Sequence, residues 1–285
     1  MDDTCYETLS QLTLSNIYLI KLSDIEDERL LVAKNNRTQI EYCWTLSSSL
    51  PLYILKKTGA SMITYLDADL FFYTSPEEIY DEFGDNSIMI IPHRFTKKNI
   101  WQEKTSGIYN VGMVIFRNDI NGLECLKWWR EKSIEWCYDR LENGKYGDQL
   151  YLNDWAIRFN KVCVLKNHGA NVASWNIARY KFFKKNNQIW MTNKETGEQL
   201  PLIFYHFHGL KIYLGRCNRV LAYPITIFQT DIYKKYLATL NKQQQEITKT
   251  IGHWSFGFVK KLDPLRLIKQ NTTSYIKKLI SLVAS

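Results

Sequence analysis

Short apolar runs alternate with longer amphipathic segments along this chain. The runs are rich in β-branched and aromatic residues, which favours strands, and the amphipathic segments repeat their apolar positions at helical spacing. Strands are expected at residues 17–20, 62–66, 87–91, 109–116, 161–165 and 202–207, and helices at 40–57, from Ser75 onward, at 122–141 and at 148–159. Pro51 predicts a break or a new start inside the first helix. The alternation predicts an α/β fold with a sheet flanked by helices.

The strand expected at 62–66 ends in two carboxylates, Asp67 and Asp69. Residues i and i+2 of a strand point to the same face, so the two side chains project together. Carboxylates this close repel each other, and a cation beside them keeps both ionised. Mg²⁺ and Mn²⁺ suit such oxygens and commonly bind substrate phosphates as well. The pattern predicts a metal and diphosphate site; a solvated strand end without a ligand is the alternative.

Length and composition restrict the class of protein. A chain of 285 residues can bury a substantial core in one large domain, which we expect at 1–250. It contains no apolar stretch long enough to cross a bilayer, and the residues after Met1 are acidic, so neither a transmembrane helix nor a signal peptide is expected. The six cysteines form no C-x-x-C pair, so neither a zinc site nor a disulfide framework is indicated. A reduced, cytoplasmic setting is expected.

Charge is distributed unevenly along the chain. Residues 1–150 hold 16 Lys and Arg against 23 Asp and Glu, a balance of −7, and residues 151–285 hold 21 against 6, a balance of +15, which gives the net charge of +8. A basic half suits an anionic partner, or it is simply a solvated surface.

The segment 251–285 combines basic with apolar and aromatic residues. It is expected to form a basic helical tail that contacts the inner face of a membrane, with a terminal helix packed on the domain as the alternative. No nucleic-acid-binding module is recognisable, so no nucleic acid is expected as a partner.

Polar residues and glycines interrupt four later segments. They are Asn110 and Gly112; Asp148 and Gln149; Trp175 and Asn176; and His206, His208, Gly209 and Lys211. A glycine inside a strand permits the close approach of a ligand or of another part of the chain. An aspartate at a helix start can instead complement the helix dipole, and tryptophans are commonly core residues.

In this order, the Asp67-x-Asp69 strand and the four later segments resemble the metal-dependent nucleotide-sugar glycosyltransferases of the GT-A fold. The nearest likeness is to the group that contains glycogenin and bacterial lipopolysaccharide galactosyltransferases, and it spans residues 40–212. The resemblance implies a single GT-A-like, Rossmann-like mixed sheet. It also implies transfer of a sugar from a nucleoside-diphosphate sugar, with UDP as the expected carrier, to a glycan or lipopolysaccharide-type acceptor in polysaccharide synthesis.

The resemblance also implies roles for individual residues. Mn²⁺ or Mg²⁺ would be held by Asp67, Asp69 and His206, with His208 as the alternative to His206 because the two share a strand face. Catalytic roles fall to Asp148, the candidate base of an inverting reaction, and to Gln149, near the anomeric carbon. Donor-binding roles fall to Asn110, Gly112, Trp175, Asn176, Gly209 and Lys211.

The sequence departs from this family in three places. No convincing strand precedes the one expected at 17–20, although these enzymes begin with a strand whose loop binds the nucleotide base. No arginine occupies residues 43–49, and Lys211 follows Gly209 by two positions rather than three. Retention or inversion therefore stays open, and a non-catalytic nucleotide-sugar-binding protein is the main alternative. A phosphohydrolase of the haloacid dehalogenase type also uses Asp-x-Asp, but Leu70 and Phe71 stand where it needs a small hydroxyl residue.

Overall fold

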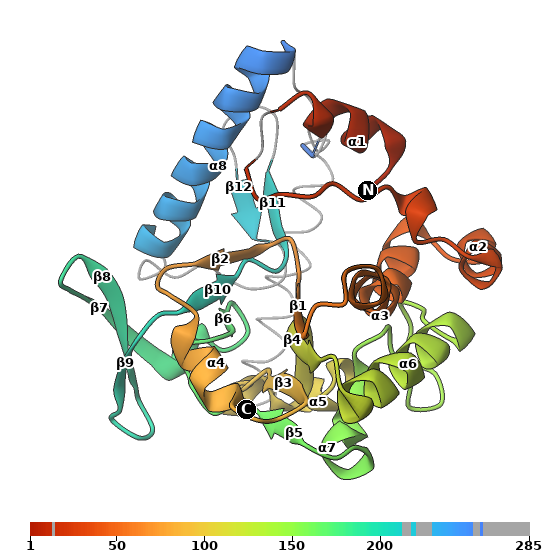
Figure 1. The fold of residues 1–285 in the computed structure, drawn as a ribbon. Helices are drawn as coiled ribbons and strands as arrows, with labels where there is room; N and C mark the ends of the chain where they lie inside the picture. The colour runs from red at the N-terminus through yellow and green to blue at the C-terminus, as the bar shows by residue number, and fades with distance from the viewer. Residues whose placement is uncertain (13–14, 213–217, 221–229, 253–256, 259–285) are drawn as a thin grey trace, which may run out of the picture.

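The computed structural model describes residues 1–12, 15–212, 218–220, 230–252 and 257–258, and its centre is a four-stranded mixed sheet (Figure 1). The strand order is β1 (Met62–Leu66), β4 (Tyr109–Arg117), β3 (Ile88–Pro92) and β5 (Val162–Val164). Strand β4 runs antiparallel to both β1 and β3, whereas β5 runs parallel to β3. The expected α/β class with a mixed sheet flanked by helices is confirmed, but the described strands are divided among four sheets rather than the single sheet that the resemblance implies.

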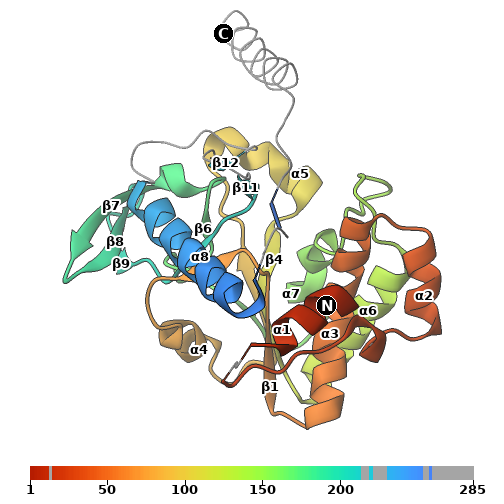
Figure 2. The same ribbon diagram turned by 90° about the horizontal axis from the view of Figure 1, so that it is seen from above.

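Side-chain alternation in β3 gives the sheet two apolar faces. Ile88 and Ile90 point to one face, and Met89 and Ile91 point to the other, since successive residues of a strand alternate. The first face is covered by α3 (Gln39–Thr58) and α6 (Ile120–Glu135), and the second by α4 (Glu77–Phe83). In Figure 2, α3 and α6 lie together on one side of β1 and β4, and α4 lies on the other. Both faces of the sheet are therefore buried, as the apolar runs require.

A second sheet brings the strand expected at 202–207 beside the turn that follows β1. Its order is β2 (Leu70–Phe72), β10 (Phe204–His206) and β6 (Val172–Ala173). β10 pairs antiparallel with β2, and His206 lies opposite Leu70. This pairing places the carboxyl end of β10 directly beside the Asp67-Ala68-Asp69 turn that joins β1 to β2.

The long helix α3 has capping residues at both ends and contains an internal proline. The side-chain oxygen of Thr38 accepts from the backbone N–H of Glu41, and the carboxylate of Glu41 accepts from the backbone N–H of Thr38. Gly59 ends the helix in the left-handed conformation, with φ of 67°. The helix continues through Pro51, so the expected break there is wrong. Its buried face packs on the sheet and compensates for the one backbone hydrogen bond that proline cannot make.

Three other expectations differ from the structure. Residues 17–20 form no strand, and Ile17 and Tyr18 are exposed, since the run pairs with no strand in the part of the chain that the structure describes. Helix α6 ends at Glu135, since Arg37 and Tyr151 donate to the carbonyls of Ile134 and Trp136 and the chain turns away. The helix expected at 148–159 is reduced to two short turns, η3 (Leu150–Asp154) and α7 (Trp155–Arg158).

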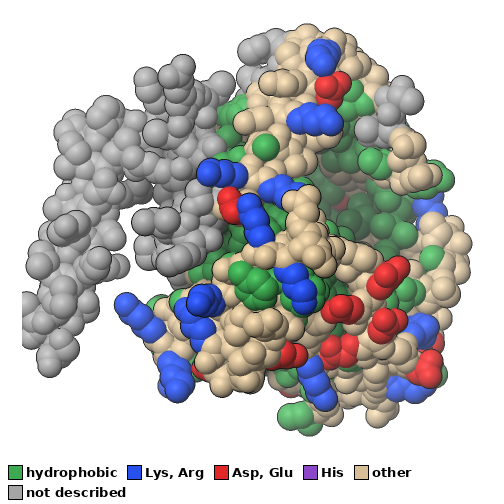
Figure 3. Space-filling view, turned by 90° about the vertical axis from the view of Figure 1, so that its left-hand side faces the viewer, with side chains coloured by type: hydrophobic (Ala, Val, Ile, Leu, Met, Phe, Trp, Pro, Cys, Tyr) green, Lys and Arg blue, Asp and Glu red, His purple; other side chains and the backbone are tan. Residues whose placement is uncertain are grey.

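The remaining elements surround this core. They are α1 (Asp3–Ser10), η1 (Leu22–Asp24), α2 (Glu28–Asn35), η2 (Lys97–Gln102), α5 (Glu103–Ser106), η4 (Ile177–Arg179), β7 (Tyr180–Lys185), β8 (Gln188–Asn193), β9 (Gln199–Pro201), β11 (Leu210–Ile212), β12 (Asn218–Val220) and α8 (Thr230–Ile251). Strands β7, β8 and β9 form a projecting antiparallel sheet beside α8. Figure 3 looks onto this side of the molecule, where Lys and Arg side chains lie among hydrophobic ones. Exposed lysines of β7 and α8 are Lys181, Lys184, Lys185, Lys234, Lys235, Lys242 and Lys249.

The predicted tail at 251–285 lies almost entirely outside the described residues, so the boundary at residue 250 and the tail's role stay predictions. Within the part of the chain that the structure describes, no helix is long and apolar enough to span a bilayer. The five cysteines in that part are free thiols.

Candidate functional site

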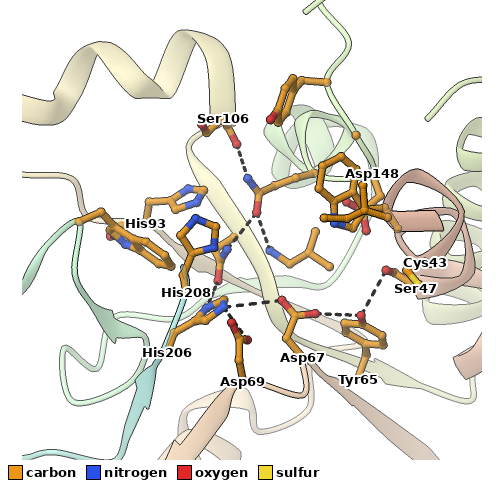
Figure 4. A pocket seen from close by; sticks show the side chains of 18 of the residues that line it. Cys43, Ser47, Tyr65, Asp67, Asp69, His93, Ser106, Asp148, His206 and His208 are labelled. Carbon is orange, nitrogen blue, oxygen red and sulfur yellow. Dashed lines mark hydrogen bonds and ion pairs between the residues drawn. The ribbon is translucent and has the colours of Figure 1, made fainter. Parts of the chain in front are cut away.

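Two carboxylates and one imidazole meet where β1 and β10 end and β2 begins (Figure 4). The backbone fixes both aspartates: the N–H of Asp67 donates to the carbonyl of Gly112, and the carbonyl of Asp69 accepts from the N–H of Phe207. His206 Nε2 consequently lies 3.0 Å from Asp69 Oδ1 and 3.8 Å from Asp67 Oδ2. The structure thus brings together the three side chains that the sequence assigns to a metal.

The electrostatics of the two carboxylates differ. Burial raises the pKa of Asp67, and the electrostatic effect of the nearby His206 only partly opposes it. Burial also acts to raise the pKa of Asp69, but the hydrogen bond and charge of His206 outweigh it and hold that pKa below its usual value. A cation between the two groups would stabilise both as carboxylates, so the donor set fits a divalent metal ion.

Asn110, at the start of β4, holds His206 in place. The N–H of Gly112 can only donate, and it lies 3.1 Å from Asn110 Oδ1, so that atom is the amide oxygen. His206 Nδ1 lies 3.2 Å from the same oxygen and therefore carries the proton. This bond leaves Nε2 as the atom that faces the carboxylates, which is the arrangement that second-layer hydrogen bonds give to metal-binding histidines.

Gln149 holds Asn110 in turn. Its Oε1 accepts from Asn110 Nδ2 at 2.9 Å and from the N–H of Val111 at 3.1 Å, and its Nε2 donates to the carbonyl of Ser106. Both lone pairs of the amide oxygen are thus engaged within the protein. Gln149 and Asn110 position His206, and the structure does not show the free carbonyl oxygen that a direct role of Gln149 at an anomeric carbon needs.

Position 112 needs glycine because two side chains lie directly over it. A Cβ at this position would lie 2.6 Å from Asn110 Oδ1 and 2.8 Å from His206 Nδ1. The sequence predicts a close approach at Gly112, and the approaching groups are these two side chains. We call Asp67, Asp69, Asn110 and His206, together with Gly112 beneath them, the strand wall.

The opposite wall carries a buried acid. Asp148 is 6% exposed, and burial raises its pKa to about 7, although a hydrogen bond from Ser47 opposes the shift. Ser47 lies 3.2 Å from the hydroxyl of Tyr65, which donates to Asp67 Oδ1 at 2.9 Å. We call Ser47, Tyr65 and Asp148 the acid wall. Its hydrogen bonds reach across to the strand wall at one point, Asp67.

Trp175 and Asn176 play different parts. Trp175 lies edge-on to the rings of His206 and His208, with centroids 5.1 and 5.6 Å away, and its Nε1 donates to the carbonyl of His93. Asn176 is fully buried and uses its amide on the backbone of His93, Asn171 and Ala173, so the structure gives it no route to a ligand. The donor-binding role expected for Asn176 is therefore not supported, because its hydrogen bonds hold the loop after β6.

Gly209 and Lys211 lie just past β10. Gly209 adopts φ of 75°, a left-handed conformation that turns the chain into β11. Desolvation and the electrostatic effects of His206 and Lys211 lower the pKa of His208, and the carboxylate of Asp69 opposes them. Lys211 is therefore within electrostatic reach of the site, although neither residue is part of the cavity wall.

A cavity of about 580 Å³ lies between the two walls. Several of its lining residues were not anticipated from the sequence: Cys43, Trp44, Ser47, His93, Phe95, Ser106 and Tyr146. The buried serines of α3 were the one available signal, since a polar run on a sheet-facing helix surface needs a partner. His93 is buried and stacked on Phe95 at 4.6 Å, and burial together with the charge of His206 lowers its pKa to about 3.

No protein-family model matches this sequence. The chain is 32% identical over 267 residues to uncharacterized protein YfnD of Bacillus subtilis (strain 168), which covers 92% of this chain and 84% of YfnD. It is 35% identical over 222 residues to uncharacterized protein YfnF of the same strain, which covers 74% of this chain and 71% of YfnF. Identity of this level over most of both chains establishes common descent. The chain therefore belongs to the protein family that contains YfnD and YfnF.

Proposed function

We propose that this protein is a metal-dependent glycosyltransferase with a GT-A-like fold. It moves a sugar from a nucleoside-diphosphate sugar, with UDP as the expected carrier, to a glycan or lipopolysaccharide-type acceptor. The observation that supports this proposal most is the approach of both carboxylates to His206 Nε2, Asp69 at 3.0 Å and Asp67 at 3.8 Å, at the edge of a cavity of about 580 Å³. The order of motifs along the chain supports it independently.

The proposed chemistry needs positive charge beside the departing diphosphate. Mn²⁺ or Mg²⁺ held by Asp67, Asp69 and His206 would stabilise the negative charge that develops on the leaving oxygen. Lys211 and Gly209 would contact the same diphosphate. Asp67 and Asp69 are partly exposed, and a donor bound over them would exclude water and so strengthen these interactions.

Asp148 is the group on the acid wall that can accept a proton. Its pKa of about 7 makes the carboxylate a base matched to neutral pH, and Ser47 orients it. If the sugar is transferred with inversion, Asp148 would take the proton of the attacking acceptor hydroxyl. Asn110 and Gln149 act through His206, whose Nε2 they direct toward the carboxylates.

The proposal extends to location. A basic tail at 251–285 would bring a cytoplasmic enzyme to the inner face of a membrane, where a lipid-linked acceptor would lie. Deleting this segment should abolish co-sedimentation with anionic liposomes. Unchanged co-sedimentation would contradict the docking role.

The test is release of nucleoside diphosphate from a panel of UDP-, GDP- and CDP-sugars, with Mn²⁺, with Mg²⁺ and with EDTA. We expect release from one donor class, only with metal, and loss of that release in Asp69→Asn. Asp81→Asn is the matched control, because Asp81 is exposed on α4 away from the cavity. Metal-independent release, or equal release by Asp69→Asn, would contradict the proposal.

A second candidate is a non-catalytic protein that binds nucleotide sugars. One observation favours it: within the described residues no strand precedes β1. In the glycosyltransferases that the chain resembles, a strand that binds the nucleotide base precedes the Asp-x-Asp strand. This candidate predicts metal-dependent nucleotide binding without release of diphosphate from any donor in the panel.

A further inference from the structure

His208 lies close enough to the proposed metal site to belong to it. One ligand atom each of Asp69, His206 and His208 lie within 4.8 Å of one another. The rings of His206 and His208 project from alternate residues at the end of β10, with centroids 6.1 Å apart and planes at 87°. Figure 4 shows both rings on the same side of the cavity as Asp69. The two histidines therefore need not be alternatives.

Trp175 contacts both rings, although His208 itself is exposed to solvent. Trp175 is 4% exposed, it lies edge-on to both imidazoles, and its Nε1 is fixed by the carbonyl of His93. A rigid wall that contacts both rings limits the rotation of each. Side chains held in this way lose little freedom when they bind an ion.

We infer that His208 is a further ligand of the metal, so that the site offers two imidazoles and the carboxylates of Asp69 and Asp67. The inference rests on the proposed metal site and goes beyond it by specifying the ion. Imidazole nitrogens suit first-row transition metals, whereas Mg²⁺ prefers oxygen ligands and water. The protein should therefore select Mn²⁺ or another first-row divalent metal over Mg²⁺.

The first test counts nitrogen ligands. Mn²⁺ is bound to the apoprotein, and electron spin-echo modulation from ¹⁴N is recorded for the wild type, His208→Gln and His206→Gln. We expect two imidazole nitrogens in the wild type and one in each variant. His168→Gln is the control, since His168 lies outside the cavity and bonds to Tyr180, and it should retain two. A single nitrogen in the wild type would overturn the inference.

The second test measures selectivity by titrating Mn²⁺ and Mg²⁺ into the apoprotein. We expect His208→Gln to weaken Mn²⁺ binding by at least about tenfold and to leave Mg²⁺ binding much less changed. Equal losses for both ions would overturn the inference.

The two tests also separate this inference from the proposed function. Two nitrogens without any nucleoside diphosphate binding would retain the inference and reject the glycosyltransferase. One nitrogen with metal-dependent nucleotide binding would reject the inference and retain the glycosyltransferase.

Discussion

The strand wall and the acid wall face each other across one cavity, but they hold their polar groups in different ways. On the strand wall, Asn110 joins His206, Gln149 and the backbone of β4 in a continuous chain of hydrogen bonds. On the acid wall, the carboxyl of Asp148 is buried beside the hydroxyl of Ser47 and has an elevated pKa. The first arrangement fixes geometry, and the second fixes a protonation equilibrium. Substitutions on the strand wall should therefore change metal affinity, whereas substitution of Asp148 on the acid wall should change the pH dependence of stability.

The largest effect is expected at Gly112. In Gly112→Ala the new methyl group would displace Asn110 and His206, so we expect metal affinity to fall by more than about 100-fold and stability to fall by about 1–3 kcal/mol. Calorimetric Mn²⁺ titration and chemical denaturation measure the two effects. Gly144→Ala is the control: no atom lies within 4 Å of its Cβ, and only its left-handed backbone is penalised. Full metal affinity in Gly112→Ala would show that the strand wall tolerates displacement.

The acid wall should respond to pH. Because the pKa of Asp148 is raised by folding, its contribution to stability is complete below the unfolded value near 4 and is lost as pH rises through about 7. At pH 8 in EDTA, Asp148→Asn should be more stable than the wild type by up to about 4 kcal/mol, and at pH 4 the difference should be small. Denaturation at both pH values measures this, with exposed Asp81→Asn as the control. A difference independent of pH would mean that Asp148 titrates normally.

A smaller effect is expected at Asn110, the link between Gln149 and His206. In Asn110→Ala the imidazole of His206 loses the acceptor that fixes its proton on Nδ1, so metal affinity should fall about 10- to 100-fold. Asn121→Ala on α6 should leave the affinity unchanged. If Asn110→Ala binds Mn²⁺ as the wild type does, the hydrogen-bond chain is not what positions His206.

The smallest effect is expected where the walls meet. Tyr65→Phe removes the hydroxyl between Ser47 and Asp67 but keeps the ring in β1. We expect a loss of about 1 kcal/mol in stability and only a few-fold loss in metal affinity, because Asp67 remains fixed through its backbone. A loss as large as that of Asn110→Ala would show that the walls act as one unit.

The comparison also explains what the sequence could predict. Strands β1, β3, β4, β5 and β10 were predictable because each apolar run is long enough to require burial. The meeting of Asp67, Asp69 and His206 followed from their places at strand ends. The run at 17–20 has the same local pattern but pairs with no strand among the described residues, and its own sequence does not indicate this difference.

The hydrogen bonds of the strand wall were beyond the sequence for a physical reason. Gln149 reaches Val111 across 38 residues, and this contact depends on the loop before η3 and on the antiparallel register of β4. The environment of Asp148 could not be predicted from the sequence either, because Ser47 comes from the distant helix α3. Local patterns identify which side chains carry chemistry, whereas tertiary packing decides whether they bind ligand or hold one another.

The central claim is a metal ion shared between the protein and a nucleoside diphosphate. The most direct measurement is calorimetric titration of UDP, GDP and CDP into the apoprotein and into the Mn²⁺-loaded protein, and of Mn²⁺ into protein with and without nucleotide. We predict that Mn²⁺ raises the affinity for one nucleotide, that this nucleotide raises the affinity for Mn²⁺ by the same factor, and that Asp69→Asn abolishes both effects. Nucleotide affinity that is the same with and without Mn²⁺ would contradict the account.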